Sequence, residues 1–323
     1  MTEAAEVLRQ GQLVAFATET VYGLGADATN PDAVARIFEA KGRPSFNPLI
    51  VHADDSVMAR SCVALWPERA ELLARRFWPG PLTLILPRSS IIPDVVTAGR
   101  DTVGIRIPAS TVARALIRAA GRPVAAPSAN RSTGISPTEA WHVQKDLDGK
   151  IDLILDSGRT DVGIESTVLD LTSDPPRVLR PGSVTVGQLS EALGEFVAGP
   201  GGAAAEGIAF VSPGQMAIHY APTTPTYRID RDVFTALPGT GRWGLISIGA
   251  LPAPPSARKP TWHIRLSTPI QAESRLYTAL HALDARRLDY LVILPPPNEP
   301  AWLAIRDRIW RASRPWPSEN AVP

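Results

Sequence analysis

The sequence places two cations one residue apart, Lys41 and Arg43, in a short Lys-Gly-Arg-Pro run. Two positive charges beside a glycine and a proline suit the several oxygens of a polyphosphate better than a single carboxylate. The same pair would also suit an exposed helix end, where cations complement the helix dipole. An apolar strand that ends at His52 follows at once, which favours a cleft over an exposed helix end. We therefore predict that both cations face a phosphate-bearing ligand.

A stretch of hydroxyls, a carboxylate and glycines precedes these cations and follows an apolar run over residues 13–16. It contains Thr20 and Glu19. No general base is assigned: Glu19 is one candidate, and a turn or helix-cap role suits it equally well. Residues 23–28 fit a loose dinucleotide fingerprint, but they lie too far from the strand and lack the expected acidic strand end. A dinucleotide site is therefore not predicted.

Further polar side chains stand at the ends of predicted strands. Apolar neighbours put Arg106 on the opposite face of its strand, where inside a pocket its guanidinium would bind a carboxylate. Ser128 and Asn130 lie between a strand and a helix, a common ligand-binding position in α/β sheets. Ser136 suits the same role or that of an ordinary helix N-cap. Two more such residues are Ser166, which opens a strand, and Arg180, which follows one.

Short β-like runs alternate with helical patterns through the first two-thirds of the chain, as an α/β fold requires. We predict strands over residues 13–16, 49–52, 82–86, 103–107, 124–126, 153–155, 166–170 and 177–179, and helices over 32–40, 67–77, 111–120, 137–146 and 186–193. A glycine- and alanine-rich run over 199–205 cannot build a core and indicates a linker. A second α/β unit follows, with strands over 243–248 and 290–294, helices over 270–283 and 301–312, and proline-rich loops over 251–260 and 295–300.

The bulk composition describes a globular protein of 323 residues, for which two domains are the default expectation. The net charge of +1 gives no global field to attract nucleic acid. The single cysteine, Cys62, rules out an internal disulfide and a cysteine zinc cluster, and the histidines show no metal-ligand spacing. Neither a signal peptide nor an apolar run of about 18 residues is evident. We expect a cytoplasmic protein that does not enter membranes.

Together these motifs resemble, in order and spacing, the threonylcarbamoyl-AMP synthase family in its two-domain form. The resemblance rests on the Thr-Glu-Thr-Val-Tyr-Gly-Leu-Gly run, Lys-x-Arg, Ser-x-Asn, Glu-Ser-Thr-Val, Arg-Pro-Gly and Ser-Pro-Gly…His-Tyr-Ala-Pro. It implies a YrdC-like twisted mixed-sheet domain over residues 1–195, with a concave, positively charged cleft. A linker over 196–226 and a smaller C-terminal Rossmann-like α/β domain over 227–323 would follow.

The resemblance implies ATP-dependent synthesis of L-threonylcarbamoyl-AMP from L-threonine and bicarbonate or CO2, with release of pyrophosphate. A tRNA threonylcarbamoyl transferase would use this product to modify the adenosine beside the anticodon. Mg²⁺ would arrive with ATP, and no metal would be held by the protein. Lys41 and Arg43 are carried over as catalytic residues. L-Threonine would contact Thr20, His52, Arg106, Ala126 and Ser166, and ATP would contact Lys41, Arg43, Asn47, Thr102, Ser128, Asn130, Ser136, Arg180 and, from the linker, Tyr220.

The sequence departs from the family in two places. Ala17 stands where proline is usual, and residues 215–218 replace a more basic run, which weakens any linker contact with phosphates beyond Tyr220. Two alternatives stay open. One is a related enzyme that forms a carbamoyl adenylate with another acceptor; Arg106, together with Thr20 and Ser166, argues against it. The other is a non-catalytic RNA-binding protein, disfavoured by the near-neutral charge and the lack of interleaved aromatic and basic residues. Weak RNA binding by the enzyme itself is compatible with a local basic cavity.

Overall fold

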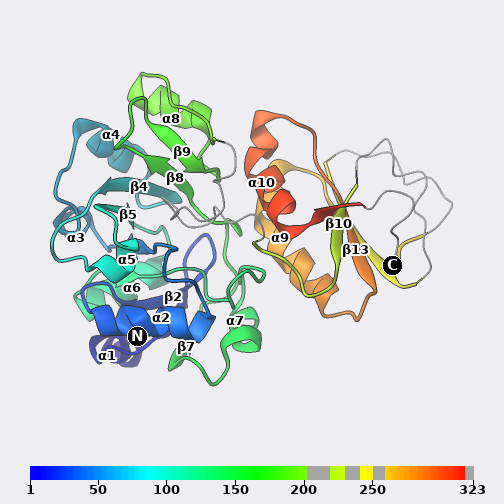
Figure 1. Cartoon of the computed structure of the whole chain (residues 1–323), viewed down its shortest axis with the longest axis horizontal. Helices are drawn as coiled ribbons and strands as arrows, with labels where there is room; N and C mark the ends of the chain where they lie inside the picture. Colours follow the sequence, from blue (N-terminus) through cyan, green and yellow to red (C-terminus); the bar gives the residue numbers. More distant parts are fainter. Residues whose placement is uncertain (202–218, 230–240, 250–258, 317–323) are drawn as a thin grey trace. The chain divides into compact units, whose positions relative to one another are not determined.

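The computed structural model describes residues 1–201, 219–229, 241–249 and 259–316. The chain divides into two compact units, Met1–Ser132 with Ser136–Gln215, and Thr133–Ile135 with Met216–Pro323. Each unit contains its own sheet and its own helices (Figure 1). Residues 212–218 of the linker motif and residues 251–258 of the proline-rich loop lie outside the described residues.

A nine-stranded mixed sheet forms the centre of the first unit, in the order β7-β1-β2-β6-β3-β5-β4-β8-β9. Its strands are β1 (Val14–Ala17), β2 (Tyr22–Asp27), β3 (Ile50–His52), β4 (Leu82–Pro87), β5 (Thr102–Arg106), β6 (Val124–Ala125), β7 (Leu153–Leu155), β8 (Thr167–Asp170) and β9 (Arg177–Arg180). The strands β3 and β5 are parallel, in a register that sets His52 beside Arg106. Polar residues far apart in sequence thereby meet at strand ends.

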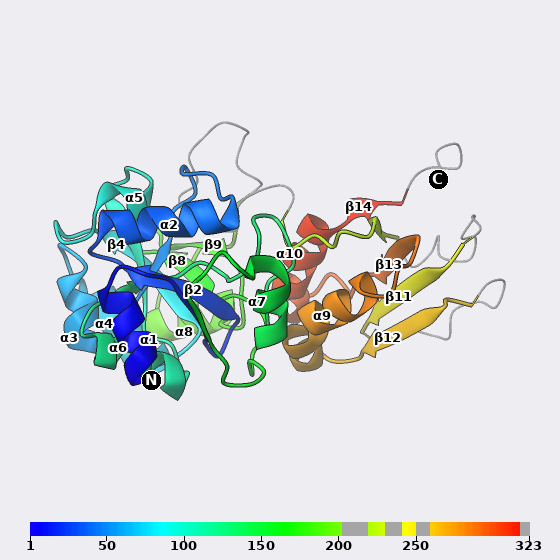
Figure 2. The same cartoon turned by 90° about the horizontal axis from the view of Figure 1, so that it is seen from below.

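Helices pack on both faces of this sheet, because successive strand residues point to opposite faces. Val14 and Phe16 join one apolar cluster with α1 and α6, whereas Leu13 and Ala15 join another with α2. Figure 2 shows α2 on one side of the sheet and α1 and α6 on the other. The helices of the unit are α1 (Thr2–Arg9), α2 (Pro31–Lys41), α3 (Ser56–Ser61), α4 (Glu68–Phe77), α5 (Asp94–Thr97), α6 (Thr111–Ala120), α7 (Ala140–Leu147) and α8 (Val186–Leu193).

The strand β2 was not predicted, because two glycines and an aspartate give it low intrinsic β-propensity. It is held instead by neighbours on both sides, pairing antiparallel with β1 and with β6. A Cβ on Gly25 would lie 2.7 Å from Cε1 of Phe16 and 2.8 Å from Cγ1 of Val124. Close packing between strands therefore explains Gly25, and the dinucleotide fingerprint has no role there.

The other predicted elements of this unit are present, most with ends shifted by one or two residues. Asn30 caps α2 as expected, since its side chain accepts hydrogen bonds from the Asp32 and Ala33 amides. The helix predicted over 137–146 begins only at Ala140. The alternative role of Ser136 as a helix N-cap is therefore wrong. The helices α1, α3 and α5 were missed.

The second unit contains a five-stranded parallel sheet in the order β12-β11-β13-β10-β14. Its elements are β10 (Thr226–Arg228), β11 (Trp243–Ile248), β12 (Trp262–Leu266), α9 (Pro269–Asp284), β13 (Tyr290–Leu294), the 3-10 turn η2 (Pro300–Trp302), α10 (Leu303–Ala312) and β14 (Arg314–Pro315). The predicted strands 243–248 and 290–294 are confirmed, and β10, β12 and β14 were missed. A large mixed sheet followed by a smaller α/β unit confirms the predicted fold class.

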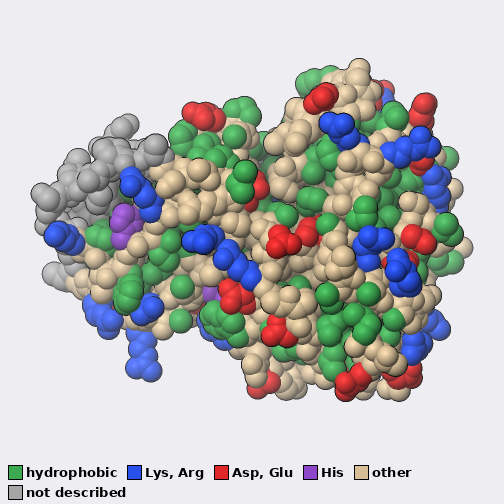
Figure 3. Space-filling view, turned by 180° about the vertical axis from the view of Figure 1, so that it is seen from behind, with side chains coloured by type: hydrophobic (Ala, Val, Ile, Leu, Met, Phe, Trp, Pro, Cys, Tyr) green, Lys and Arg blue, Asp and Glu red, His purple; other side chains and the backbone are tan. Residues whose placement is uncertain are grey.

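Charge is distributed unequally along the chain. Residues 219–323 contain 13 Lys and Arg against 8 Asp and Glu, whereas residues 1–218 contain 20 against 24. On the face shown in Figure 3, acidic side chains are sparse near the grey atoms and alternate with basic ones farther from them. The near-neutral net charge thus combines a slightly acidic first part with a basic second part.

Arginine and tryptophan side chains pack against each other in the second unit. Trp310 has the guanidinium carbon of Arg228 5.0 Å and that of Arg306 4.5 Å from its ring centroid. The guanidinium carbon of Arg286 lies 3.8 Å from the ring centroid of Trp262. These contacts are cation–π pairs and do not test the expectation that interleaved aromatic and basic residues are lacking.

Over the described ranges, no helix is both long enough and apolar enough to cross a membrane. The same ranges contain no group of three or more His, Cys, Asp or Glu side chains arranged to hold a metal ion.

Candidate functional site

Lys41 lies at the last position of α2 and is buried, with 4% of its surface exposed. Gly42 follows in the left-handed conformation (φ 60°), ends the helix and turns the chain. The Nζ of Lys41 donates to the carbonyls of Ser128 (2.6 Å) and Asn130 (2.5 Å). Lys41 thus holds the Ser-x-Asn loop, 87 and 89 residues further along the chain. The alternative of a cation exposed at a helix end is wrong.

Burial lowers the pKa of Lys41 well below its usual value, and the nearby positive charge of Arg43 lowers it further. Arg43 is also buried: its Nε donates to the carbonyl of Asn47 (3.2 Å) and its Nη2 to that of Pro48 (3.0 Å). Two cations held this close repel each other, and an anion placed between or beside them would relieve that repulsion. The geometry therefore favours a strongly charged ligand.

Arg106 is the centre of a second buried cluster, at the end of β5. Its Nη1 lies 3.2 Å from Oε1 of Glu19 and 3.1 Å from Oγ1 of Thr20. Its Nη2 lies 3.0 Å from Nε2 of His52. The Nε of Arg106 is buried and has no hydrogen-bond partner among the described residues. A buried donor of this kind costs free energy unless an acceptor meets it.

Burial and the hydrogen-bond donors around His52 determine its protonation state. Burial lowers the pKa of His52 well below its usual value, and the charge of Arg106 adds to the effect. His52 is therefore neutral near pH 7. A guanidinium only donates, so Nε2 of His52 must accept and its proton must lie on Nδ1. Burial also lowers the pKa of Arg106, with a further lowering from Arg180, while Glu19 acts in the opposite direction.

Glu19 is engaged through both carboxylate oxygens. Oε1 accepts from Arg106, and Oε2 accepts from the amide of Ala109 at 2.9 Å. The ion pair is buried, with 4% and 6% of the Arg106 and Glu19 side chains exposed. A carboxylate committed in this way orients the guanidinium. Glu19 lies in the turn between β1 and β2, which agrees with the turn role offered from sequence, and from there it positions Arg106.

Ser166 and Arg180 meet across the β8–β9 pair. The Nε of Arg180 donates to the Ser166 carbonyl (3.0 Å) and its Nη2 to the Ser166 hydroxyl (3.1 Å). A Cβ on Gly182 would lie only 2.4 Å from the amide of Thr167, so the Arg-Pro-Gly run requires glycine for this close approach. The positive charge of Arg180 contributes to lowering the pKa of Arg106. The two arginines therefore belong to one electropositive region.

Ala126, Thr102 and Ser136 were also predicted from sequence to bind substrate. Ala126 directly follows β6, and its amide donates to the Ile50 carbonyl at 3.0 Å. Thr102 begins β5 and so lies at the opposite end of this strand from Arg106, about 13 Å away. The hydroxyl of Ser136 donates to Oε1 of Glu165 at 2.6 Å. The buried carboxylate of Glu165 was not singled out from sequence.

Tyr220 belongs to the second unit, where it is buried with a positive φ of 63°. Its ring lies 4.0 Å from that of His219 and 5.5 Å from that of Tyr277, centroid to centroid. The guanidinium carbon of Arg308 lies 5.4 Å from the ring centroid of Tyr220. Within its own unit, Tyr220 is therefore held by aromatic and cationic contacts.

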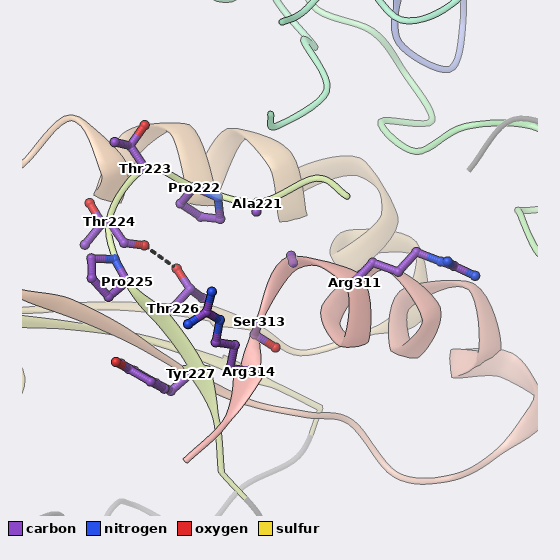
Figure 4. Close-up of a pocket in the computed structure, with 11 residues that line it drawn as sticks. Ala221, Pro222, Thr223, Thr224, Pro225, Thr226, Tyr227, Arg311, Ser313 and Arg314 are labelled. Atoms are coloured by element: carbon purple, nitrogen blue, oxygen red, sulfur yellow. Dashed lines mark hydrogen bonds between the residues drawn. The ribbon is translucent and has the colours of Figure 1, made fainter. Parts of the chain in front are cut away.

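A cavity of about 260 Å³ lies beside the segment that follows Tyr220 in the second unit (Figure 4). The residues that line it are Ala221, Pro222, Thr223, Thr224, Pro225, Thr226, Tyr227, Arg311, Ala312, Ser313 and Arg314. None of the residues predicted from sequence to bind substrate is among them. The guanidinium of Arg311 pairs with Asp307, and Figure 4 shows this side chain pointing away from the other lining residues.

Comparison with known proteins identifies the family of the chain. Residues 6–182 match a family described as "Telomere recombination", and residues 184–314 match "Threonylcarbamoyl-AMP synthase, C-terminal domain". The threonylcarbamoyl-AMP synthase of Pyrococcus abyssi is 50% identical over 220 residues, which are 68% of this chain and 65% of that protein. That of Bacillus subtilis is 42% identical over 321 residues, 97% of this chain and 92% of that protein.

The solved structures agree with the sequence comparison. The crystal structure of P. abyssi Sua5 complexed with L-threonine superposes with a TM-score of 0.86 and 38% identity, covering 97% of this chain and 95% of that one. The predicted resemblance is thus confirmed over both units. The chain belongs to the threonylcarbamoyl-AMP synthase family.

Proposed function

We propose that this chain makes L-threonylcarbamoyl-AMP from L-threonine, bicarbonate or CO2, and ATP, and releases pyrophosphate. The observation that carries the proposal is the buried Arg106, whose Nε lacks a partner among the described residues while Glu19, Thr20 and His52 hold the rest of the guanidinium. Such a fork suits a carboxylate. A relative 38% identical to this chain has been solved in complex with L-threonine, which supports the choice of amino acid.

On this proposal, Arg106 binds the threonine carboxylate. Thr20, His52 and Ser166 stand around it, and the backbone at Ala126 completes the pocket. Because His52 is neutral and its Nε2 faces Arg106, it adds no second cation that would compete for the carboxylate. The pocket therefore recognises one negative group and positions the amine beside it.

Lys41, Arg43 and Arg180 supply the positive charge for ATP. The other nucleotide contacts are Asn47, Thr102, Ser128, Asn130, Ser136 and Tyr220. Burial lowers the pKa of Lys41, but a polyphosphate beside it favours the charged form again. Mg²⁺ would be held by the ATP phosphates and neutralise part of their charge.

The chemistry needs positioning and charge more than a protein nucleophile. The threonine amine captures CO2 as an N-carboxylate, whose oxygen then attacks the α-phosphorus while pyrophosphate leaves. Negative charge spreads over the non-bridging oxygens, and the buried cations stabilise it without reorganising. This makes the enzyme a nucleotidyltransferase. Its product serves threonylcarbamoylation of tRNA beside the anticodon, a cytoplasmic process.

Tyr220 is assigned the closure of the nucleotide site from the linker. Tyr220→Ala should raise the KM for ATP more than that for threonine. An unchanged KM for ATP would remove this part of the proposal.

The test is pyrophosphate release from ATP with Mg²⁺, bicarbonate and each amino acid in turn. Release that depends on both threonine and bicarbonate supports the proposal. Pyrophosphate release that does not depend on threonine would keep the residues assigned to ATP and would mean that another compound is the acceptor. No release under any condition, together with salt-dependent RNA binding, would favour the RNA-binding alternative.

A further inference from the structure

Thr83 carries a buried hydroxyl beside the proposed amino-acid pocket, and no ligand role was predicted for it. It lies on β4 with none of its surface exposed, and its Oγ1 is 2.8 Å from Oγ of Ser166. Valine has nearly the same shape and would avoid the cost of burying a hydroxyl. The hydroxyl therefore needs an explanation, and its contact with Ser166 supplies one.

The direction of the hydrogen bonds at Ser166 is partly determined. The Nη2 of Arg180 donates to Oγ of Ser166 at 3.1 Å, and a guanidinium cannot accept. Ser166 has one hydroxyl proton and two lone pairs, and Arg180 uses one lone pair. Only the direction of the bond between Ser166 and Thr83 is left to choose.

The two directions differ in which proton is left over. If Ser166 donates to Thr83, the proton of Thr83 has no acceptor among the described residues and no exposure to water. If Thr83 donates to Ser166, both lone pairs of Ser166 are used and its own proton is free for a third partner. An acceptor that binds beside Ser166 therefore selects the second direction, because every hydroxyl proton then has an acceptor.

We propose that Thr83 is a positioning residue that makes the Ser166 hydroxyl a donor toward a carboxylate-type oxygen of the amino-acid substrate. This inference rests on the proposed function, which places Ser166 at the threonine. Arg180, assigned to ATP, binds the same hydroxyl. The hydrogen bonds from Arg180 to Ser166 and between Ser166 and Thr83 thus link the two proposed substrate sites through the Ser166 hydroxyl.

The experiment measures threonine-dependent pyrophosphate release by the full chain carrying Thr83→Val. We expect the KM for threonine to rise roughly threefold to tenfold, the range of one hydrogen bond, with the KM for ATP nearly unchanged. Thr83→Ser, which keeps the hydroxyl, should restore most of the affinity for threonine. The matched control is Thr97→Val, which removes another buried threonine hydroxyl whose bonds go to backbone carbonyls.

The outcomes separate the inference from the proposed function. A wild-type chain without threonine-dependent release contradicts the proposed function itself. An active wild type with an unchanged KM for threonine in Thr83→Val overturns the role of Thr83 alone. Equal increases in the KM for threonine in Thr83→Val and Thr83→Ser would show a purely structural role and also overturn it. Should Thr83→Val not fold, Thr83→Cys takes its place, since a thiol is a weak donor of similar size.

Discussion

The two units differ in how several of their cations are held, although the second unit also contains one buried arginine, Arg308, whose charge Asp307 balances. In the first, Lys41, Arg43, Arg106 and Arg180 are all less than 9% exposed. Each is held by carbonyl, hydroxyl, imidazole or carboxylate groups, which come from distant parts of the sequence for Lys41 and Arg106 and from four and five residues away for Arg43. In the second, Arg228, Arg286 and Arg306 lie over tryptophan rings, and Trp262 and Trp310 are themselves exposed.

The difference bears on where chemistry takes place. Burying a cation costs several kcal/mol. Buried cations of this kind are common at functional sites, where a negatively charged ligand offsets part of that cost. An arginine that stacks on an exposed tryptophan costs little and stabilises the fold by roughly 0.5–1 kcal/mol. The comparison assigns catalysis to the first unit and predicts how variants in the two should differ.

The largest effect should come from Lys41→Ala and Arg43→Ala. Each removes a buried charge assigned to phosphate stabilisation, so we expect kcat for pyrophosphate release to fall about 10²- to 10³-fold. Arg75→Ala is the matched control, because that side chain is 77% exposed. Thermal unfolding of each variant separates lost catalysis from lost folding. Activity within twofold of wild type in either of the first two variants would contradict the assigned roles.

A smaller and more selective effect is expected for Arg106→Lys. Lysine keeps the positive charge next to Glu19 but lacks the planar fork that binds a carboxylate at two points. The KM for threonine should rise about tenfold to a hundredfold, and ATP binding should change little. Steady-state kinetics with each substrate varied in turn provides the measurement. An equal loss of ATP affinity would contradict the assignment of Arg106 to the threonine pocket.

How far the sequence predicts this site depends on whether the signal is local. Lys41 ends α2 and Arg43 follows it, and both the helix cap at Asn30 and the glycine stop at Gly42 are local signals, so the position of the two cations at a helix end was predictable. The ion pair between Glu19 and Arg106 joins residues 87 positions apart, and it forms because the turn between β1 and β2 lies beside the end of β5. No local pattern encodes that contact.

The misses have the same physical cause. The strand β2 has low intrinsic propensity and is strand only because β1 and β6 pair with it. Ser136 carries a true N-cap signal, but its hydroxyl donates to Glu165, 29 residues away, and the helix begins later. Thr83 reads as an ordinary strand residue until Ser166 is placed beside it. Tertiary partners override local preference at these positions.

The buried His52 predicts an effect of intermediate size on how the free energy of unfolding depends on pH. Burial and the charge of Arg106 lower the pKa of His52 well below 6.5 in the folded state. Below pH 6.5 the unfolded chain therefore binds a proton that the folded chain refuses, and the free energy of unfolding falls as the pH falls. The slope from this group is at most about 1.4 kcal/mol per pH unit. Urea unfolding at pH 7, 6 and 5 should show a flatter dependence for His52→Gln, and identical slopes would contradict a buried neutral histidine.

The smallest effect is expected in the second unit, for Arg306→Gln. Arg306 stacks on Trp310 and donates through Nη1 to the Pro296 carbonyl at 2.9 Å, so its contacts are structural and partly exposed. We expect a loss of about 0.5–1 kcal/mol in the free energy of unfolding and no change in kcat or in either KM. Arg286→Gln, at the other stacked tryptophan, should behave alike. A large loss of pyrophosphate release with unchanged stability would show that these surface cations take part in the reaction, and the contrast between the two units would then fail.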